Sequence, residues 1–148
     1  MLYVGPVINR GVGQGLERAL AGLPWARHIG AVPHDQMGSL LSQADVILNC
    51  SISEGGMANS LLEALWLGRA VLASDIEGNR SVIDHGKTGL LFRDEAEFER
   101  GAAALVRDRG LRERLGRAGR DLVVQKYSGG QEVEGYKEVY RDLIGALA

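Results

Sequence analysis

The sequence predicts an α/β fold, in which a parallel sheet carries helices on both faces. Short apolar runs alternate with stretches of helical periodicity, which favours strand–helix–strand units with right-handed crossovers. The apolar runs do not alternate with polar residues, as is typical of strands buried on both faces. Many of the 21 glycines stand at the ends of these runs, where loops need positive φ or close backbone approach.

Five strands and three helices are expected in the first 92 residues. The strands are predicted at 2–8, 27–32, 45–50, 70–76 and 89–92. Helices are predicted at 16–21, 34–43 and 57–67, with a glycine-rich loop at 9–15. Met37, Leu40 and Leu41 have the helical spacing that supports the second of these helices. Gly68 follows the third helix, a residue type that commonly ends helices.

The chain from about residue 94 is predicted to be helical. Asp94 and Glu97 resemble a capping box at a helix start. Three amphipathic stripes follow, formed by Phe98, Ala102 and Leu105, by Leu111, Leu115, Ala118 and Leu122, and by Val133, Tyr136, Val139, Tyr140, Leu143 and Leu147. They predict three helices that pack on the sheet or on each other. We therefore expect one domain over 1–148, with a helical C-terminal part from about 94.

Composition excludes several classes of partner. The chain is 45% hydrophobic and 24% charged with a net charge of −2, so nothing favours nucleic acid or an anionic membrane surface. No apolar run approaches the roughly 20 residues of a membrane span, and the start has no signal-peptide pattern. The lone cysteine, Cys50, cannot form an internal disulfide, which favours a reducing compartment and a cytoplasmic location.

Two glycine-containing motifs resemble phosphate-binding loops but do not fit them. Gly86-Lys87-Thr88 resembles the end of a P-loop, yet Ser81 stands where that motif needs a glycine and a strand is expected to follow. The glycines at 11–15 suggest a dinucleotide fingerprint, but its third glycine would fall at Leu16. We expect a turn and a loop at these places.

The residue types needed for a metal site are scattered. Three histidines and one cysteine have no metal-ligand spacing, so no metal or cofactor is expected. His28 is expected to be structural. His34 follows Pro33 at a strand-to-helix turn, where a ligand could be met.

The segment from Glu54 to Glu63 carries the strongest functional signal. It joins a buried strand end to a Gly-Gly loop and a mostly apolar helix. Asn59, Ser60 and Glu63 share one helical face near the helix start. The N–H groups and positive dipole of a helix start favour an anion such as phosphate, whereas carboxylates accept hydrogen bonds from hydroxyls. A nucleotide sugar has both groups. The alternative is that Glu63 pairs with a basic residue and the glycines only permit a tight turn.

Five segments in this order resemble a known family. They are ADVIL at 44–48, SEGG at 53–56, LEA at 62–64, GRAVLASD at 68–75 and GKTGLLF at 86–92. Together they are similar to the C-terminal half of retaining GT-B glycosyltransferases of family 4, the glycosyl transferases group 1. The resemblance runs from about residue 2 to 140 and implies a Rossmann-like sheet.

In that family this half binds the nucleotide-sugar donor without a metal, and the resemblance implies the roles of individual residues. Glu63 would bond the ribose hydroxyls, and Glu54 would lie near the transferred sugar. The diphosphate and sugar would be faced by Gly55, Gly56, Met57, Ala58 and Asn59, and the base would lie near Val32, Pro33 and His34. The helix start would stabilise the departing diphosphate. No catalytic base is assigned.

The chain departs from the family pattern in three ways. Eight residues separate Glu54 from Glu63, where the family has seven. The strand and helix that normally carry a basic pair for the diphosphate are absent, as if the half were truncated at its N-terminal side, and Arg10 or Arg80 could substitute. The acceptor-binding half is absent. A non-catalytic nucleotide-sugar-binding module or inactive fragment is therefore an alternative, and an epimerase of the same fold is a third interpretation.

Overall fold

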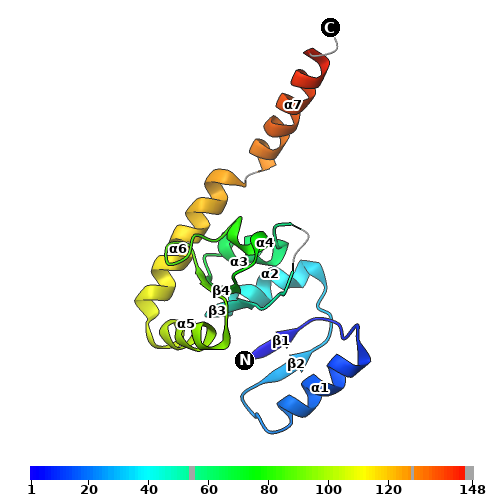
Figure 1. Ribbon diagram of the computed structural model, residues 1–148, viewed down its shortest axis with the longest axis vertical. Coiled ribbons are helices and arrows are strands. Elements are labelled where there is room, and N and C mark those ends of the chain that lie inside the picture. Colours follow the sequence, from blue (N-terminus) through cyan, green and yellow to red (C-terminus); the bar gives the residue numbers. More distant parts are fainter. Residues whose placement is uncertain (54–55, 128, 146–148) are drawn as a thin grey trace. The chain divides into compact units, whose positions relative to one another are not determined.

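The computed structural model describes residues 1–53, 56–127 and 129–145. These residues fall into two compact units, Met1–Leu40 and Leu41–Ala148. Each unit is described by itself, and Figure 1 labels the elements of both. The expectation of a single domain over 1–148 stays a prediction.

The first unit contains a two-stranded parallel sheet. Strand β1 (Leu2–Val4) pairs with β2 (Arg27–Ile29), with Leu2 opposite Arg27. Both strands are shorter than predicted, and β1 ends at Gly5, whose φ of +137° interrupts the strand.

Helix α1 (Arg10–Leu20) corrects the predicted loop at 9–15. The Asn9 side chain caps its first turn by accepting hydrogen bonds from the N–H groups of Gly11 and Val12. Gly13 is buried against the Val7 side chain, and a Cβ at this position would clash with Val7. The cap and the close packing therefore offset the low helix propensity of the glycines.

Helix α2 (His34–Ser42) forms where a helix was predicted at 34–43. It begins directly after Pro33, whose carbonyl oxygen accepts from the N–H of Gln36.

The second unit is built on a three-stranded parallel sheet in the order β3-β4-β5. Its strands are β3 (Val46–Asn49), β4 (Ala70–Ser74) and β5 (Leu90–Phe92). Central β4 is buried on both faces, because Val71 and Ala73 belong to one core cluster and Ala70 and Leu72 to another. The prediction of continuous apolar strands in a parallel sheet is confirmed here.

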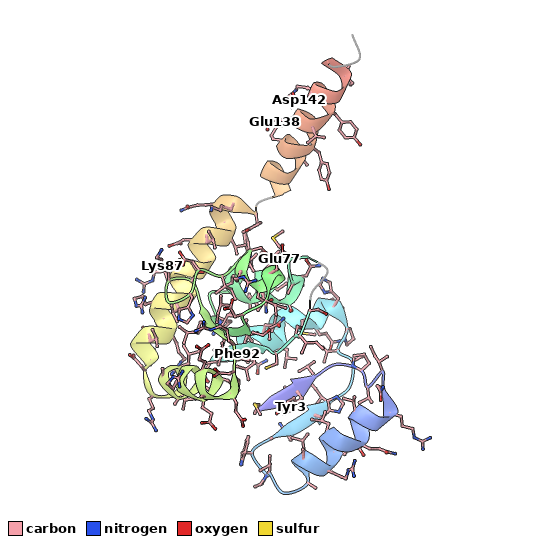
Figure 2. The ribbon with its side chains drawn as sticks, viewed as in Figure 1. Tyr3, Glu77, Lys87, Phe92, Glu138 and Asp142 are labelled. Carbon is pink, nitrogen blue, oxygen red and sulfur yellow. The ribbon has the colours of Figure 1, made fainter. Side chains whose placement is uncertain are left out.

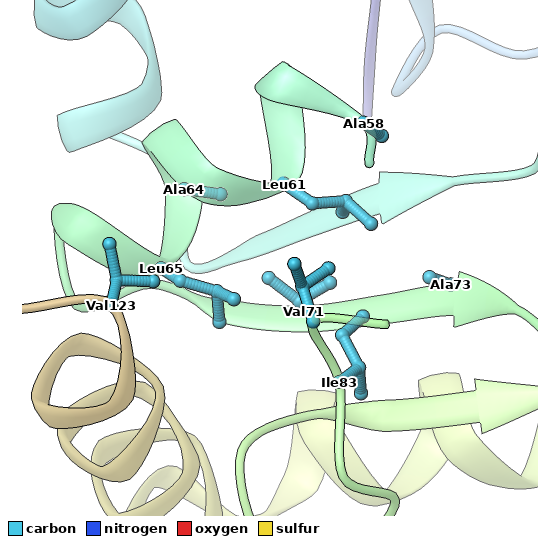
Figure 3. Packing of buried hydrophobic residues seen from close by; sticks show 9 residues of the cluster. Ala58, Leu61, Ala64, Leu65, Val71, Ala73, Ile83 and Val123 are labelled. Atoms are coloured by element: carbon cyan, nitrogen blue, oxygen red, sulfur yellow. The ribbon is translucent and has the colours of Figure 1, made fainter. Parts of the chain in front are cut away.

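Helices cover both faces of this sheet. They are α3 (Asn59–Trp66), α4 (Glu77–Arg80), α5 (Glu95–Arg107) and α6 (Arg109–Lys126). Figure 3 shows the cluster in which Leu61 and Leu65 of α3 pack with Val71. On the opposite face Leu105 of α5 and Leu115 of α6 pack against Leu72.

The start of α5 matches its prediction. Asp94 Oδ1 accepts from the N–H of Glu97 at 2.8 Å, and the Glu97 carboxylate bonds back to the N–H of Arg93. Phe98 meets Phe92 edge-on with ring centroids 5.2 Å apart, and Phe92 is labelled in Figure 2. The cap and the aromatic pair fix the beginning of α5 against the end of β5.

Helix α7 (Gly129–Gly145) carries most of the third apolar stripe, and the described side chains of that stripe are exposed. The exposed side chains are Val133, Tyr136, Val139, Tyr140 and Ile144. The expectation that this stripe packs on the sheet or on another helix is therefore wrong for these residues, since no described element covers them. No helix in the described parts of the chain combines the length and apolar character that a membrane span requires.

Candidate functional site

The candidate site lies where β3 passes into α3, at the carboxyl edge of the three-stranded sheet. Glu54 and Gly55 lie outside the described residues, so their predicted contacts are not assessed. Gly56 and Met57 are exposed, and the helix begins at Asn59 rather than at the predicted residue 57. The residue before it, Ala58, is in an extended conformation and packs in the core.

Among the described residues, no side chain caps the start of α3. Ala58 offers only its carbonyl oxygen, which accepts from the N–H groups of Leu61 and Leu62. An uncapped helix start leaves N–H groups directed outward, together with the positive end of the helix dipole. This geometry suits an anion, as predicted for this segment.

The polar face predicted on α3 is present. Asn59 and Ser60 are exposed, and Glu63, on the same face, is half-buried. The opposite face is buried in the core through Leu61, Ala64 and Leu65, as Figure 3 shows. Glu63 makes contacts of its own within the fold. The helix is less buried than predicted, because the side chain of Trp66 is 51% exposed.

A hydrogen-bond network anchors the beginning of the loop that leads to α3. The Asn49 side chain accepts from the N–H of Ser51 at 3.1 Å, and the Ser74 hydroxyl donates to the carbonyl oxygen of Ser51. Asn79, from α4, donates to the Ser74 carbonyl oxygen at 2.9 Å. These bonds tie the loop to the ends of β3 and β4.

Asn79 is a residue that the sequence analysis missed. Its side chain is fully buried, and its Oδ1 has no hydrogen-bond partner among the described residues. The four-residue helix that carries it, α4, was not predicted because segments this short have no periodicity to detect.

Arg10 and Arg80, suggested as substitutes for the basic pair that contacts the diphosphate in the family, have different surroundings. Arg80 Nη1 donates to both the carbonyl oxygen and Oδ1 of Asp75, each at 2.9 Å. Its charge is therefore already paired at the carboxyl end of β4. Arg10 begins α1 in the first unit and is exposed.

The residues predicted near the base belong to the first unit. Val32 is half-buried, and Pro33 and His34 are exposed at the turn between β2 and α2. His28, predicted to be structural, makes a hydrogen bond through Nε2 to the carbonyl oxygen of Gly5 at 2.9 Å. It links the two strands of this unit at their ends.

The segment Gly86-Lys87-Thr88 forms a turn that leads into β5 and opens no helix, so it is not a P-loop. Gly86 has a φ of +79°, and the buried Thr88 hydroxyl accepts from the N–H of Asp84 at 2.9 Å. Lys87 pairs with the Asp84 carboxylate at 2.8 Å. The segment therefore has a structural role in entering the last strand.

The described residues around this site favour neither a metal ion nor a reactive thiol. Within the described residues, no three His, Cys, Asp or Glu side chains gather closely enough to hold a metal ion. Cys50 follows β3 and is exposed. Desolvation raises the pKa of its thiol, which lowers the fraction of reactive thiolate.

Comparison with known proteins places this geometry in a family. Residues 2–108 match the family described as glycosyl transferases group 1. The chain is 32% identical over 137 residues to alpha-maltose-1-phosphate synthase of Mycolicibacterium smegmatis, an alignment that covers 86% of this chain and 34% of that protein. It is 29% identical over 117 residues to an uncharacterized glycosyltransferase of Methanocaldococcus jannaschii, covering 78% of this chain and 30% of that protein. The chain thus spans about a third of the length of the curated relatives it matches.

Solved structures share the fold. Sucrose-phosphate synthase of Thermosynechococcus elongatus superposes with a TM-score of 0.84 at 23% identity, covering 98% of this chain and 38% of that one. HepE of Anabaena, solved in complex with UDP-glucose, superposes with a TM-score of 0.82 at 16% identity, covering 95% of this chain and 40% of that one. The fold is therefore that of a Rossmann-like GT-B domain. With the match of residues 2–108, these findings show that the chain belongs to the group 1 family of glycosyl transferases.

Proposed function

We propose that this chain is the donor-binding part of a retaining glycosyltransferase of family 4, which transfers a sugar from a nucleoside diphosphate sugar to an acceptor. The observation that carries the proposal is the start of α3. An uncapped helix start at the carboxyl end of a parallel strand adjoins a polar face of Asn59, Ser60 and Glu63. Ligands of open α/β sheets bind at this edge. HepE, which shares the fold, was solved with UDP-glucose.

Each part of the donor has a proposed partner. Glu63 accepts hydrogen bonds from the ribose hydroxyls, and the start of α3 faces the diphosphate through Gly56, Met57, Ala58 and Asn59. Glu54 and Gly55 lie outside the described residues, and their roles toward the sugar and the diphosphate stay predictions. Val32, Pro33 and His34 of the first unit are the proposed partners of the base. As charge develops on the departing diphosphate, the N–H groups and dipole of α3 stabilise it. The reaction proceeds without a metal, so added chelator should leave its rate unchanged.

We further propose that the domain is completed by a strand and helix that supply the basic pair for the diphosphate. The first unit has only two strands, and two-stranded sheets are marginal in isolation. The three-stranded sheet also presents β3 as an edge, and native proteins usually shorten, cover or pair the edges of their sheets. The acceptor would bind on the remaining part of the enzyme. A reducing, cytoplasmic location is supported by the single cysteine.

Replacement of Glu63 tests the ribose role. Glu63→Ala should weaken UDP binding roughly tenfold or more, because a carboxylate that accepts two hydroxyl bonds is lost. Isothermal titration calorimetry with UDP and UDP-glucose measures the change. Circular dichroism should show the same helix content as the parent chain, since Glu63 lies on the half-buried face of α3 and outside the core cluster.

A matched control separates a binding effect from a general loss of charge. Glu99 is an exposed glutamate in the middle of α5, and Glu99→Ala should leave UDP affinity unchanged. Equal affinity in Glu63→Ala and the parent chain would contradict the ribose role. If UDP does not bind, a thermal-shift screen of UDP-, GDP- and ADP-sugars identifies the base, because a ligand specific for the folded state raises the apparent stability.

A non-catalytic nucleotide-sugar-binding module is the second candidate function. It is favoured by one observation, that the chain spans about a third of its curated relatives. Donor hydrolysis and transfer assays distinguish the two candidates. Release of UDP that depends on an added acceptor supports an enzyme, whereas saturable binding without release supports a module.

A further inference from the structure

The outer edge of β5 borders a cavity on the three-stranded sheet. Within the described residues β5 pairs with β4 alone, and α5 packs beside it. A cavity of about 400 Å³ lies along this edge, and we name it the β5-edge pocket. Its lining includes Asp75, His85, Leu91, Arg93, Glu97 and Arg100.

The backbone donors along this edge are already engaged. The N–H of Leu91 donates to His85 Nδ1 at 2.9 Å, and the N–H of Arg93 donates to Glu97 Oε2 at 2.9 Å. An edge whose N–H groups are occupied by side chains is a poor template for an added strand. The pocket is therefore suited to a small ligand rather than to a peptide strand.

Both carboxylates of the pocket are also engaged. Asp75 accepts from Arg80 at 2.9 Å, and Glu97 accepts from Nε and Nη2 of Arg93 in a two-pronged ion pair. This pairing lowers the pKa of Glu97 to about 2, so the carboxylate stays ionised and neutralises Arg93. Each of the two carboxylates therefore has its negative charge compensated by an arginine.

Hydrogen-bond donors remain in excess. His85 Nδ1 accepts from a backbone N–H, so in the neutral ring the proton is on Nε2, which is a donor. Arg100 is exposed, and no ion pair within the described residues involves it. Of the two arginines that line the pocket, Arg93 is paired with Glu97, whereas Arg100 makes no ion pair within the described residues.

We propose that the β5-edge pocket binds the phosphate group of a small phosphomonoester. Arg100 supplies a planar guanidinium, which matches phosphate oxygens in two-pronged geometry, and His85 Nε2 adds a neutral donor. Leu90 and Leu91 provide apolar lining for the rest of the ligand. The cavity is within the size range of small-molecule sites and is larger than phosphate alone.

This pocket is distinct from the candidate donor site. The donor segment follows β3, whereas the pocket lies along β5, and β4 separates the two strands in the sheet. The proposal therefore does not depend on the proposed glycosyltransferase activity. It holds or fails whether or not UDP binds at the start of α3.

Titration of the full ¹⁵N-labelled chain with inorganic phosphate, at constant ionic strength, tests the proposal by NMR. The amide signals of Leu91, Arg93 and Gly101 should shift along one saturable curve with a millimolar dissociation constant. Arg100→Gln should raise that constant roughly three- to tenfold, because the charge-assisted hydrogen bonds of the guanidinium are lost at a partly solvated site. Phenyl phosphate should bind more tightly than inorganic phosphate, because Leu90 and Leu91 provide apolar lining, and equal affinity of the two would overturn the phosphomonoester as the ligand.

Arg107→Gln is the matched control. Arg107 is exposed near the end of the same helix and does not line the pocket, so its replacement should leave the dissociation constant unchanged. Equal weakening by Arg107→Gln would show non-specific attraction and overturn the proposal. An absence of saturable shifts at the three amides into the tens of millimolar phosphate would also overturn it.

Discussion

Asn79 links three segments at the edge of the sheet that carries the candidate donor site. Its Nδ2 donates to the carbonyl oxygen of Ser74 at 2.9 Å, to the Ser74 hydroxyl at 3.2 Å and to Asn49 Oδ1 at 3.4 Å. Asn49 and Ser74 in turn hold the backbone of Ser51. The amide group therefore sets the direction in which the loop toward α3 leaves the sheet.

Asn79→Ala should lower the free energy of unfolding by about 1–3 kcal/mol, because the Ser74 carbonyl oxygen, the Ser74 hydroxyl and Asn49 Oδ1 each lose a hydrogen bond from Nδ2. The loss is moderated by removal of Oδ1, a buried acceptor without a partner in the described chain. Urea denaturation measures the difference. Glu77→Ala, an exposed change in the same short helix, should cost much less. Equal stability of Asn79→Ala and the parent chain would exclude an anchoring role.

Ionisation of Glu97 should make the stability of the fold depend on pH. Hydrogen bonds from the Arg93 side chain and N–H lower the pKa of Glu97 from 4.5 to about 2. A depressed pKa in the folded state stabilises the fold above the ordinary pKa, and this contribution is lost as pH falls from about 4.5 to about 2. Glu97→Gln should therefore lower the melting temperature at neutral pH, and its difference from the parent should shrink across that window.

Glu99→Gln provides the comparison, since Glu99 is exposed on the same helix and forms no ion pair within the described residues. Thermal melts of the three chains from pH 6 to pH 2 measure both differences. A Glu97→Gln difference that is the same at every pH would contradict the assigned pairing.

The sequence predicted the polar face of α3 but not the hydrogen-bond network of Asn49, Ser74 and Asn79. Asn59, Ser60 and Glu63 could be placed together because helical spacing alone puts them on one face. Asn79 and Ser74 are five positions apart and meet through a turn and a four-residue helix. Such contacts depend on tertiary geometry, which spacing does not encode.

At the scale of elements, one glycine controls how α6 packs on the end of α3. A Cβ on Gly116 would clash with the carbonyl group of Gly68, which follows α3 with a φ of +66°. Both atoms of that carbonyl are backbone, so the clash cannot be relieved by a side-chain rotation. The close approach therefore requires glycine at position 116, whereas position 68 favours glycine because of its positive φ.

Gly116→Ala should therefore destabilise the fold by about 1–3 kcal/mol through overpacking, despite the higher helix propensity of alanine. Gly135→Ala in α7 is the matched substitution, because a Cβ there meets nothing within 4 Å. It should leave stability unchanged or raise it. Urea midpoints of the two variants give the comparison, and a Gly116→Ala midpoint at or above the parent would refute the close approach.

Element positions were predicted better than element ends. Strands β3, β4 and β5 lie within their predicted ranges because continuous apolar runs mark strands buried on both faces. The first turns of α1 were predicted as a loop because glycines have low helix propensity. In the structure these turns are helical because Asn9 caps them and Gly13 packs on Val7. Propensity is a weak guide where tertiary packing opposes it.

At the scale of the whole molecule, the two compact units differ in how much core they contain. In the second unit, Leu61, Leu65, Val71 and Leu72 have no exposed surface. In the first unit, the β1 residues Leu2, Tyr3 and Val4 are 37–39% exposed and the sheet has two strands. Because burial of apolar surface is the main source of stability, the first unit should open at a lower free energy than the second.

Hydrogen exchange should reveal this difference directly. The backbone amides of β1 and β2 should exchange roughly tenfold or more faster than those of β4, after correction for intrinsic rates, since local opening costs least where few apolar contacts are lost. Mass spectrometry of peptides spanning residues 1–8, 26–32 and 69–76 measures the rates on one sample. The peptide spanning 89–93 serves as an internal control, because β5 is an edge strand of the better-packed sheet and should lie between the extremes. Equal protection of β1 and β4 would mean that both units open in a single cooperative step.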